Sequence, residues 1–267
     1  MNITVDIGNS LSKIALFEND GLDRHCVAGS DPQSYPQSPR LVEYFQYNTL
    51  TEHDIQTILD NNSVDAGIVC SVKKDETWLP ELLSKRLKQF YELTPQLPIP
   101  LVIDYQTPHT LGMDRIAAAV GAYSIRPMTD LLVIDIGTAI TIDFVSSTGV
   151  YKGGNISPGP DLRFKALNAY TDRLPLVDAE GALPTFGYDT ATAIRSGVIG
   201  GIVRELDTYI DEQKKNAAVF AFLTGGYAFY FENKLSNRTF ADENLVLKGL
   251  NTILNENSYQ LSVTGYQ

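Results

Sequence analysis

The chain has 267 residues, of which 43% are hydrophobic and 20% are charged, enough for one large folded domain or two domains of about 130 residues. The formal net charge of −11 disfavours a protein that binds nucleic acid or an anionic membrane surface, because either partner would require a basic patch. No apolar stretch reaches the ~18 residues of a membrane span, and the first residues lack the pattern of a signal peptide. We therefore expect a cytoplasmic protein with no membrane partner and no nucleic-acid partner.

The first half of the chain has the pattern of strands followed by alternating helices and strands. Two apolar runs, 2–8 and 12–17, predict a β-hairpin with glycine, asparagine and serine in its turn. Both cysteines, Cys26 and Cys70, lie in apolar runs, which favours buried thiols over a disulfide. The remaining elements predicted here are a strand near Cys26 and Val27, a helix over 52–59, a strand over 66–72, a helix over 78–93, a strand over 101–104 and a helix over 113–125.

A similar order of elements begins again after Pro127. The predicted elements are strands over 131–136, 141–145 and 150–155, a helix after Pro160, a long helix from about 190 to 214, a strand over 219–223 and two more helices, the second covering 244–255. This order predicts an α/β protein with two domains, 1–127 and 128–267, each a mixed sheet flanked by helices. Three glycines lie inside the long helix at a cost of about 1 kcal/mol each, so we expect another element to pack closely against Gly197, Gly200 and Gly201.

The tripeptide Asp-Ile-Gly occurs twice, at 6–8 and 135–137, each time at the end of an apolar run and before a short polar side chain. Glycine lets backbone N–H groups approach phosphate oxygens, and a carboxylate can hold a metal ion or its waters. A single copy would be explained by an ordinary hairpin turn. Two copies in matching context predict a duplicated fold that holds phosphates between its halves. A carboxylate at the end of a buried strand is costly unless it is paired, so we favour a cation at Asp135 over a merely satisfied turn aspartate.

A third motif, Leu111 to Arg115, enters the predicted helix over 113–125. Asp114 in the first turn of a helix would favour the helix dipole in any protein. The adjacent Arg115 suggests more, because a carboxylate beside a guanidinium can act as a general base next to an anion clamp. His109 is an alternative base, although a lone histidine after proline is more often structural. Two glycine-rich segments, 152–159 and 224–226, are consistent either with tight turns or with a ligand close to the backbone.

Together these motifs resemble the acetate kinase, sugar kinase, chaperone ATPase and actin superfamily. The resemblance implies two related ribonuclease H-like (actin-like ATPase) domains. More narrowly, the sequence is similar to type III pantothenate kinase over nearly its whole length, in the order and spacing of segments 6–10, 111–115, 135–143 and 153–159. The Gly-x-Asp-Arg element at 112–115 is the specific one, because the other superfamily members are not expected to have it.

The resemblance implies an ATP-dependent kinase that phosphorylates the primary hydroxyl of pantothenate to 4′-phosphopantothenate, the first step of coenzyme A biosynthesis. It also implies Mg²⁺ with ATP, a monovalent cation (K⁺ or NH₄⁺) and a homodimer. A requirement for cations is consistent with the negative net charge of the chain, because an acidic protein that holds ATP needs them. Phosphoryl transfer itself depends mainly on positioning and charge neutralisation.

The same resemblance implies roles for individual residues. Asp114 would be the proton acceptor, and Asp135 would bind the monovalent cation. The ATP phosphates would be held by Asp6, Ile7, Gly8, Asn9, Ser10, Leu11, Ser12, Lys13 and Thr138. Pantothenate would be contacted by Tyr105, Gly112, Met113, Asp114, Arg115 and Thr190, the last of these across the dimer interface. The family often has asparagine where this chain has Asp189.

Two other functions are compatible with the motifs. One is a related kinase or phosphatase that acts on another small metabolite, such as a sugar or acetate. The other is a non-catalytic nucleotide-binding regulator of the same superfamily. The presence of Asp6, Asp114 and Asp135 disfavours a loss of catalysis, and the short chain without large insertions disfavours a filament-forming protein.

Overall fold

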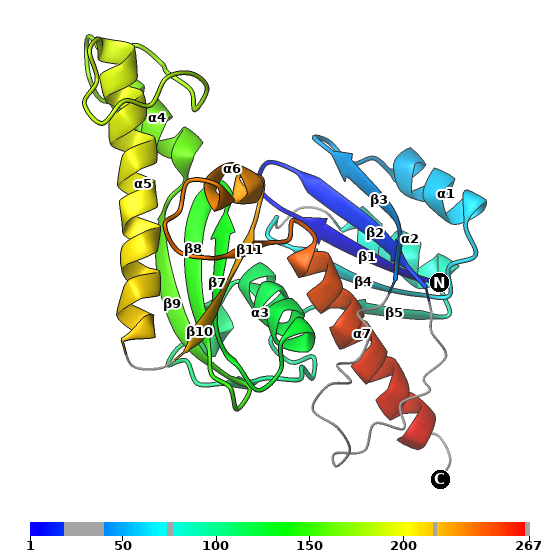
Figure 1. Ribbon diagram of the computed structural model, residues 1–267. Coiled ribbons are helices and arrows are strands. Elements are labelled where there is room, and N and C mark those ends of the chain that lie inside the picture. Colours follow the sequence, from blue (N-terminus) through cyan, green and yellow to red (C-terminus); the bar gives the residue numbers. More distant parts are fainter. Residues whose placement is uncertain (19–39, 74–76, 216–217, 265–267) are drawn as a thin grey trace. The chain divides into compact units, whose positions relative to one another are not determined.

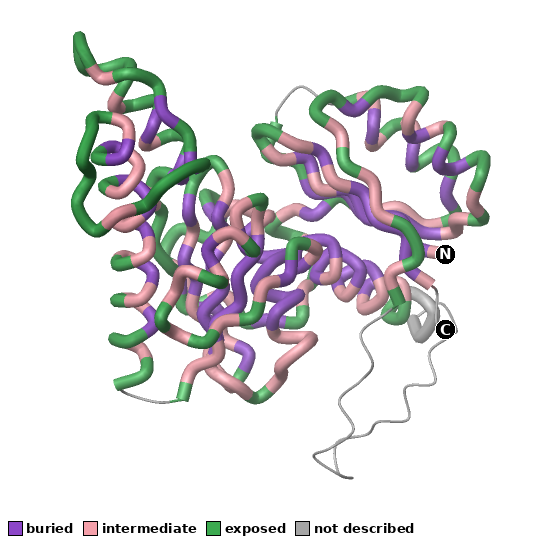
Figure 2. The backbone as a smooth tube through the Cα atoms, turned by 45° about the horizontal axis from the view of Figure 1, so that its top comes forward, coloured by how far each residue is buried: buried purple, intermediate pink, exposed green. Residues whose placement is uncertain are grey.

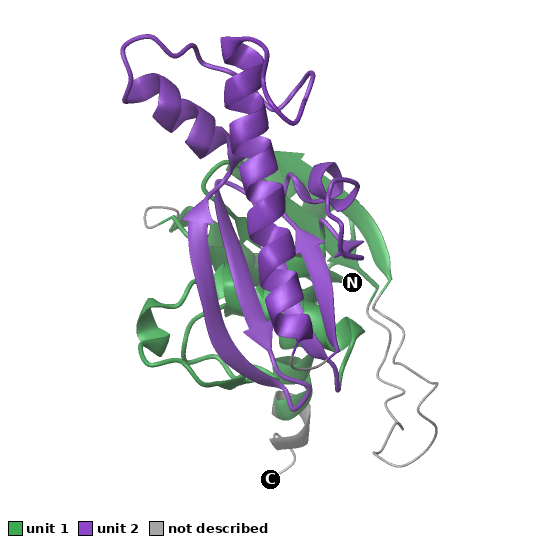
Figure 3. Cartoon of the chain, turned by 60° about the vertical axis from the view of Figure 1, so that its left-hand side comes forward, with its two compact units in different colours: residues 1–127, 244–267 green, residues 128–243 purple. Residues whose placement is uncertain are grey.

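The computed structural model describes residues 1–18, 40–73, 77–215 and 218–264, and the chain divides into two units (Figures 1 and 3). The first unit contains residues 1–127 and 244–267, and the second contains residues 128–243. The strand predicted near Cys26, and Cys26 itself, lie outside the described residues. Within the described ranges, no helix has the length and apolar character needed to cross a membrane.

The first unit is built on a five-stranded sheet with the strand order β3-β2-β1-β4-β5. Its strands are β1 (Asn2–Ile7), β2 (Ser12–Phe17), β3 (Leu41–Tyr47), β4 (Ala66–Ser71) and β5 (Gln89–Glu92). β2 pairs antiparallel with both β1 and β3, whereas β4 is parallel to both β1 and β5. Alternate residues of β1, Ile3 and Val5 among them, form one hydrophobic core with residues of α1 (Glu52–Asn61) and α2 (Trp78–Arg86).

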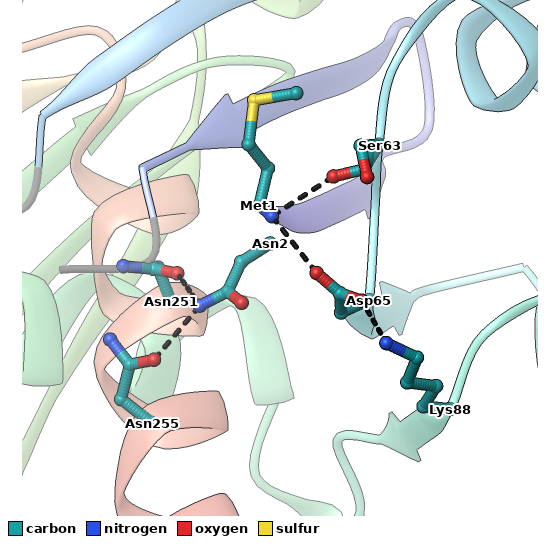
Figure 4. A network of polar contacts seen from close by, with 7 residues as sticks. All are labelled: Met1, Asn2, Ser63, Asp65, Lys88, Asn251 and Asn255. Carbon is teal, nitrogen blue, oxygen red and sulfur yellow. Dashed lines mark hydrogen bonds and ion pairs between the residues drawn. The ribbon is translucent and has the colours of Figure 1, made fainter. Parts of the chain in front are cut away.

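Two helices pack on each other in the same unit, α3 (Met113–Ile125) and α7 (Leu245–Thr264). Their backbones are in contact, because a Cβ atom at Gly249 would lie 1.8 Å from the carbonyl oxygen of Ala117. α7 also packs against β1, where the buried Asn2 side chain donates hydrogen bonds of 2.8 Å to the Oδ1 atoms of Asn251 and Asn255 (Figure 4). These contacts explain why residues 244–267, which we expected in the second domain, lie with the first unit.

The second unit contains strands in the order β11-β10-β7-β8-β9. They are β7 (Asp130–Ile136), β8 (Ala139–Val145), β9 (Val150–Pro158), β10 (Val219–Thr224) and β11 (Phe240–Ala241). One face of this sheet forms a hydrophobic core with α5 (Thr190–Lys214), and α4 (Pro160–Ala169) and α6 (Ala228–Glu232) add to it.

The two sheets have the same topology. In each sheet the central strand (β1 or β7) pairs antiparallel with the next strand of the chain (β2 or β8), and that strand pairs antiparallel with a third (β3 or β9). On its other side the central strand pairs parallel with a fourth strand (β4 or β10). The orders β3-β2-β1-β4-β5 and β9-β8-β7-β10-β11 therefore correspond strand for strand. Figure 2 shows the central strands of both units as buried. This correspondence confirms the predicted duplication and the mixed sheets flanked by helices.

Three expectations about secondary structure and packing were wrong. The predicted helix over 78–93 ends at Arg86, and its remainder forms β5, because Leu87 is already extended (φ −102°, ψ 149°). Strands β3 and β11 were not predicted. The close packing expected around the glycines of α5 is absent at Gly197 and Gly201, where a Cβ atom would meet no heavy atom of the structure within 4 Å.

The short elements β6 (Val102–Ile103) and the 3₁₀ helix η1 (Pro108–Thr110) complete the chain.

Candidate active site

In the first unit, Asp6 lies near the end of β1, just before a tight turn. Its neighbours across the sheet are Lys13 on β2 and Cys70 on β4, so these side chains share one face. The turn is closed by a hydrogen bond of 3.0 Å from the Gly8 N–H to the carbonyl oxygen of Leu11. Asn9 and Ser10 are exposed at its tip. The turn can therefore present backbone N–H groups to an anion.

Asp114 lies in the first turn of α3, which follows its N-cap residue Gly112. The Oδ1 atom of Asp114 accepts a hydrogen bond of 2.9 Å from the N–H of Arg115. A Cβ atom at position 112 would lie 2.5 Å from that same oxygen. Glycine at 112 is thus what allows the Asp114 carboxylate to take this orientation. The Arg115 side chain is buried in the same helix.

Cys70 connects these two carboxylates. Its side chain is 1% exposed on β4, which packs against α3. Burial raises the pKa of the Cys70 thiol, and the negative charges of Asp6 and Asp114 raise it further. Asp6 and Asp114, which come from separate segments, therefore lie close enough to the thiol for their charges to raise its pKa. Asp6 and Asp114 both lie near Cys70 in the first unit.

In the second unit, Asp135 occupies the position on β7 that Asp6 occupies on β1. Its neighbours across the sheet are Thr141 on β8 and Thr224 on β10. The following turn is one residue shorter than in the first unit, because Ile136 pairs with Ile140 whereas Ile7 pairs with Ser12. Thr138 is exposed in this turn.

Gly225 brings the backbone after β10 against the Asp135 carboxylate. Its φ of +86° is a conformation that favours glycine, and a Cβ atom there would lie 2.4 Å from Oδ1 of Asp135 and 2.7 Å from the carbonyl oxygen of Ile136. Carboxylate and carbonyl oxygens are ligands that hard cations prefer. Within the described residues, no group of three or more His, Cys, Asp or Glu side chains could hold a metal ion.

The glycine-rich segment 152–159 serves close packing within the second unit. A Cβ atom at Gly159 would lie 2.0 Å from the carbonyl oxygen of Gly137, and one at Gly154 would lie 2.5 Å from Oδ1 of Asp143. Asp143 is buried and accepts a hydrogen bond of 2.6 Å from the hydroxyl of Tyr151. The segment is strand β9 rather than a tight turn, and its glycines allow close approach of neighbouring backbone, with Gly159 against the turn that carries Thr138.

Three further predicted site residues are described by their burial and by the elements that carry them. Ser12 is buried, and it alternates with Lys13 so that its side chain points to the opposite face of the sheet from that of Asp6. Tyr105 is half-buried in the segment between β6 and η1. Thr190 is exposed at the start of α5, directly after the N-cap residue Asp189. A cavity of about 370 Å³ beside α1 and another of about 270 Å³ beside α4 are lined by none of the predicted site residues.

Asp189 has a structural role at the start of α5. Its Oδ1 atom accepts a hydrogen bond of 2.8 Å from the N–H of Thr192, which caps α5. Asparagine and aspartate are about equally good N-caps, so the difference from the asparagine that is frequent in the resembled family leaves the start of this helix intact.

Comparison with known proteins gives the family of the chain. A family model described as type III pantothenate kinase matches residues 2–212. A type III pantothenate kinase from Azobacteroides pseudotrichonymphae is 47% identical over 95% of this chain and 96% of its own length. Another, from Phocaeicola vulgatus, is 42% identical over 96% of this chain and 99% of its own length.

Solved structures show the same fold. A protein from Campylobacter jejuni, described as belonging to the Baf family of transcriptional activators, has a TM-score of 0.60 with 26% identity and covers 96% of this chain and 99% of its own. The activator of 2-hydroxyisocaproyl-CoA dehydratase from Clostridium difficile has a TM-score of 0.56 with 10% identity, covering 100% and 98%. A glucokinase from an Antarctic psychrotroph has a TM-score of 0.51 with 10% identity, covering 96% and 98%.

Proposed function

The chain belongs to the type III pantothenate kinase family, and on that basis we propose which of its residues carry the reaction. It phosphorylates pantothenate to 4′-phosphopantothenate in coenzyme A biosynthesis, with ATP as the phosphate donor and a divalent metal accompanying the nucleotide. Our assignment of the site depends on one observation, the convergence of Asp6 and Asp114 on Cys70 in the first unit.

Asp114 is assigned as the proton acceptor. The primary hydroxyl oxygen of pantothenate attacks the γ-phosphorus of ATP, the bond to the bridging oxygen breaks, ADP leaves, and the hydroxyl proton passes to the carboxylate. The backbone N–H of Arg115 orients Oδ1 of Asp114, which leaves Oδ2 for the substrate. The Arg115 guanidinium, which can form paired hydrogen bonds, is assigned to the pantothenate carboxylate. Gly112, Met113 and Tyr105 line the same pocket in this assignment.

The turn after β1 is assigned to the ATP phosphates with Mg²⁺ as the divalent ion. Asn9 and Ser10 are exposed at its tip, and Lys13 shares the face of Asp6, where it adds positive charge. Since the Ser12 side chain points to the other face, its contribution is limited to the backbone. The hydroxyl of Thr138 in the second unit adds a donor to the phosphates.

Asp135 is assigned as a ligand of a monovalent cation, K⁺ or NH₄⁺. The fit is supported by the carboxylate and carbonyl oxygens that surround Gly225. When bound, such an ion supplies positive charge that offsets the negative charge of the nucleotide.

A homodimer in the cytoplasm is the expected form of the enzyme. Support comes from large apolar side chains exposed just before α5, with Phe186 87% and Tyr188 74% exposed, because apolar side chains that gather on one surface mark interaction sites. Thr190 lies beside them, which agrees with a role at the active site of the partner subunit.

The direct test is the formation of ADP by the purified chain with ATP, Mg²⁺ and K⁺, with and without pantothenate. We expect ADP formation to require pantothenate, and faster phosphorylation of a sugar or acetate would instead identify a related kinase. The variant Asp114→Asn should lose turnover by a factor of about 10²–10⁴ while still binding ATP. Turnover retained by this variant would exclude Asp114 as the base.

A further inference from the structure

The hydroxyl of Thr224 at the end of β10 is an unusual polar group. Thr224 is 1% exposed, and its Oγ1 atom has no hydrogen-bond partner among the residues that the structure describes. A buried hydroxyl without a partner destabilises a folded protein, and valine would fill the same space without that cost. The presence of threonine therefore indicates a ligand. We propose that Oγ1 of Thr224 coordinates the monovalent cation assigned to Asp135, an inference that rests on the proposed function.

The position of Thr224 fits this role. It is the neighbour of Asp135 across the parallel pair of β7 and β10, so the two side chains project from the same face of the sheet. The next residue, Gly225, is held within contact distance of the Asp135 carboxylate and of the Ile136 carbonyl oxygen. A hydrogen bond of 3.1 Å from the Tyr227 N–H to that carbonyl fixes the backbone here. A carboxylate, a carbonyl and a hydroxyl therefore gather at the carboxyl ends of two adjacent strands.

The chemistry of this group favours a cation over a phosphate. The carboxylate of Asp135 repels an anion, whereas the carboxylate, the carbonyl and the hydroxyl oxygen can all coordinate a cation. Oxygen ligands from backbone and side chains replace the hydration shell of K⁺ in selective sites. The group named here contains one carboxylate, which matches an ion of charge +1, since divalent cations bind most strongly where several carboxylates meet.

The test measures cation binding to the full chain without nucleotide or pantothenate, so it does not depend on turnover. The unfolding temperature is followed as KCl or NH₄Cl is added to a choline buffer, with NaCl as the control for ionic strength. The variants are Thr224→Val, which removes the hydroxyl, and Thr224→Ser, which keeps it. Asp135→Asn serves as the reference for loss of the site, and Thr141→Val is the matched control, because Thr141 neighbours Asp135 on the other side.

We expect K⁺ and NH₄⁺ to raise the unfolding temperature of the wild type and of the Thr224→Ser and Thr141→Val variants. Thr224→Val should need roughly tenfold more K⁺ for the same half-maximal shift. Without K⁺ it should be at least as stable as the wild type, because it lacks the unpaired hydroxyl. Asp135→Asn should lose the response.

Three results would overturn the inference: a wild-type response in Thr224→Val, a loss in Thr224→Ser as large as that in Thr224→Val, or no response in the wild type. A buried water, rather than a cation, on the Thr224 hydroxyl would give the first of these. Pantothenate-dependent ADP formation is measured separately, so failure of this inference leaves the proposed kinase activity to its own test.

Discussion

Cys70 and Asp6 are direct neighbours across the parallel pair of β1 and β4, and the buried thiol also experiences the charge of Asp114 on α3. A neutral side chain therefore lies beside two carboxylates that are assigned to ATP and to the substrate hydroxyl. A third negative charge at this point would oppose both, and the raised pKa of the thiol keeps Cys70 uncharged at physiological pH.

The reactivity of Cys70 follows from this arrangement. Because the thiolate is the reactive form, iodoacetamide at pH 8 should modify Cys70 far more slowly in the native protein than in guanidinium chloride. Peptide mass spectrometry would follow this residue specifically. Burial is the largest cause of the raised pKa, so Asp114→Asn should still be protected. Equal rates in the native and unfolded protein would contradict the buried position.

Gly225 and Gly226 offer an adjacent pair for testing the close approach at Asp135. Alanine at 225 would be strained by the positive φ, at a cost of about 1–3 kcal/mol, and its Cβ would displace the Asp135 carboxylate. Alanine at 226 meets no heavy atom of the structure within 4 Å. We expect Gly225→Ala to lower the unfolding temperature and abolish the K⁺ response, and Gly226→Ala to fold with the stability of the wild type. Similar unfolding temperatures for the two variants would show that the backbone does not approach Asp135 as described.

The contact between α3 and α7 should tolerate no side chain at Gly249. Because the added Cβ would overlap the backbone of Ala117, the helices must separate, and we expect Gly249→Ala to lose roughly 3 kcal/mol of unfolding free energy. Gly197→Ala is the helical control, since its Cβ enters open space and alanine favours a helix by about 1 kcal/mol. Chemical denaturation measures both variants. An unchanged midpoint for Gly249→Ala would refute the backbone contact.

The N-cap of α5 should make stability depend on pH. Hydrogen bonds from the backbone and side chain of Thr192 lower the pKa of Asp189 below its ordinary value. A carboxyl group with a lowered pKa stabilises the fold above its unfolded pKa of about 3.8, and this contribution disappears as the pH falls through the folded value. The stability advantage of the wild type over Asp189→Ala should therefore be constant at neutral pH and shrink below pH 3.8.

Asp189→Asn provides the control, because the amide caps the helix without titrating in this range. Thermal unfolding as a function of pH would measure all three proteins. A difference between wild type and Asp189→Ala that persists unchanged at the lowest pH would contradict the charged cap.

Local patterns predicted the elements that depend on local interactions. The bounds of α3 and α5 agree with the predicted 113–125 and with the predicted start at 190, because caps and proline stops are encoded next to the helices that they end. The hairpins around Asp6 and Asp135 were also predicted, since glycine and short polar residues between two apolar runs are typical of such turns. β3 was missed because its apolar residues alternate weakly, and β11 because it is only two residues long. The duplication nevertheless offered a signal, because each has a counterpart in the other unit.

Longer-range packing could not be predicted in the same way. The apolar residues of 78–93 fit one face of a helix, yet Phe90 packs onto the same core from β5. The pairing of α7 with α3 depends on glycines that meet across more than a hundred residues of sequence, which no local pattern contains. At the site, the motifs singled out Asp6, Asp114 and Asp135, but the buried Cys70 beside Asp6 and the lone hydroxyl of Thr224 became apparent only from the fold.

The first unit is discontinuous in sequence, and this has a consequence for biosynthesis. A ribosome releases β1 and α3 long before it releases α7. For that time the nascent chain has the rest of the first unit without α7, the helix that packs on both β1 and α3. Residues 128–243, by contrast, are contiguous and can form their own sheet earlier. Premature termination between residues 136 and 243 would thus yield polypeptides that contain Asp6, Asp114 and Asp135 but lack the helix that packs on α3. Such fragments would be substrates for proteolysis rather than partly active kinases.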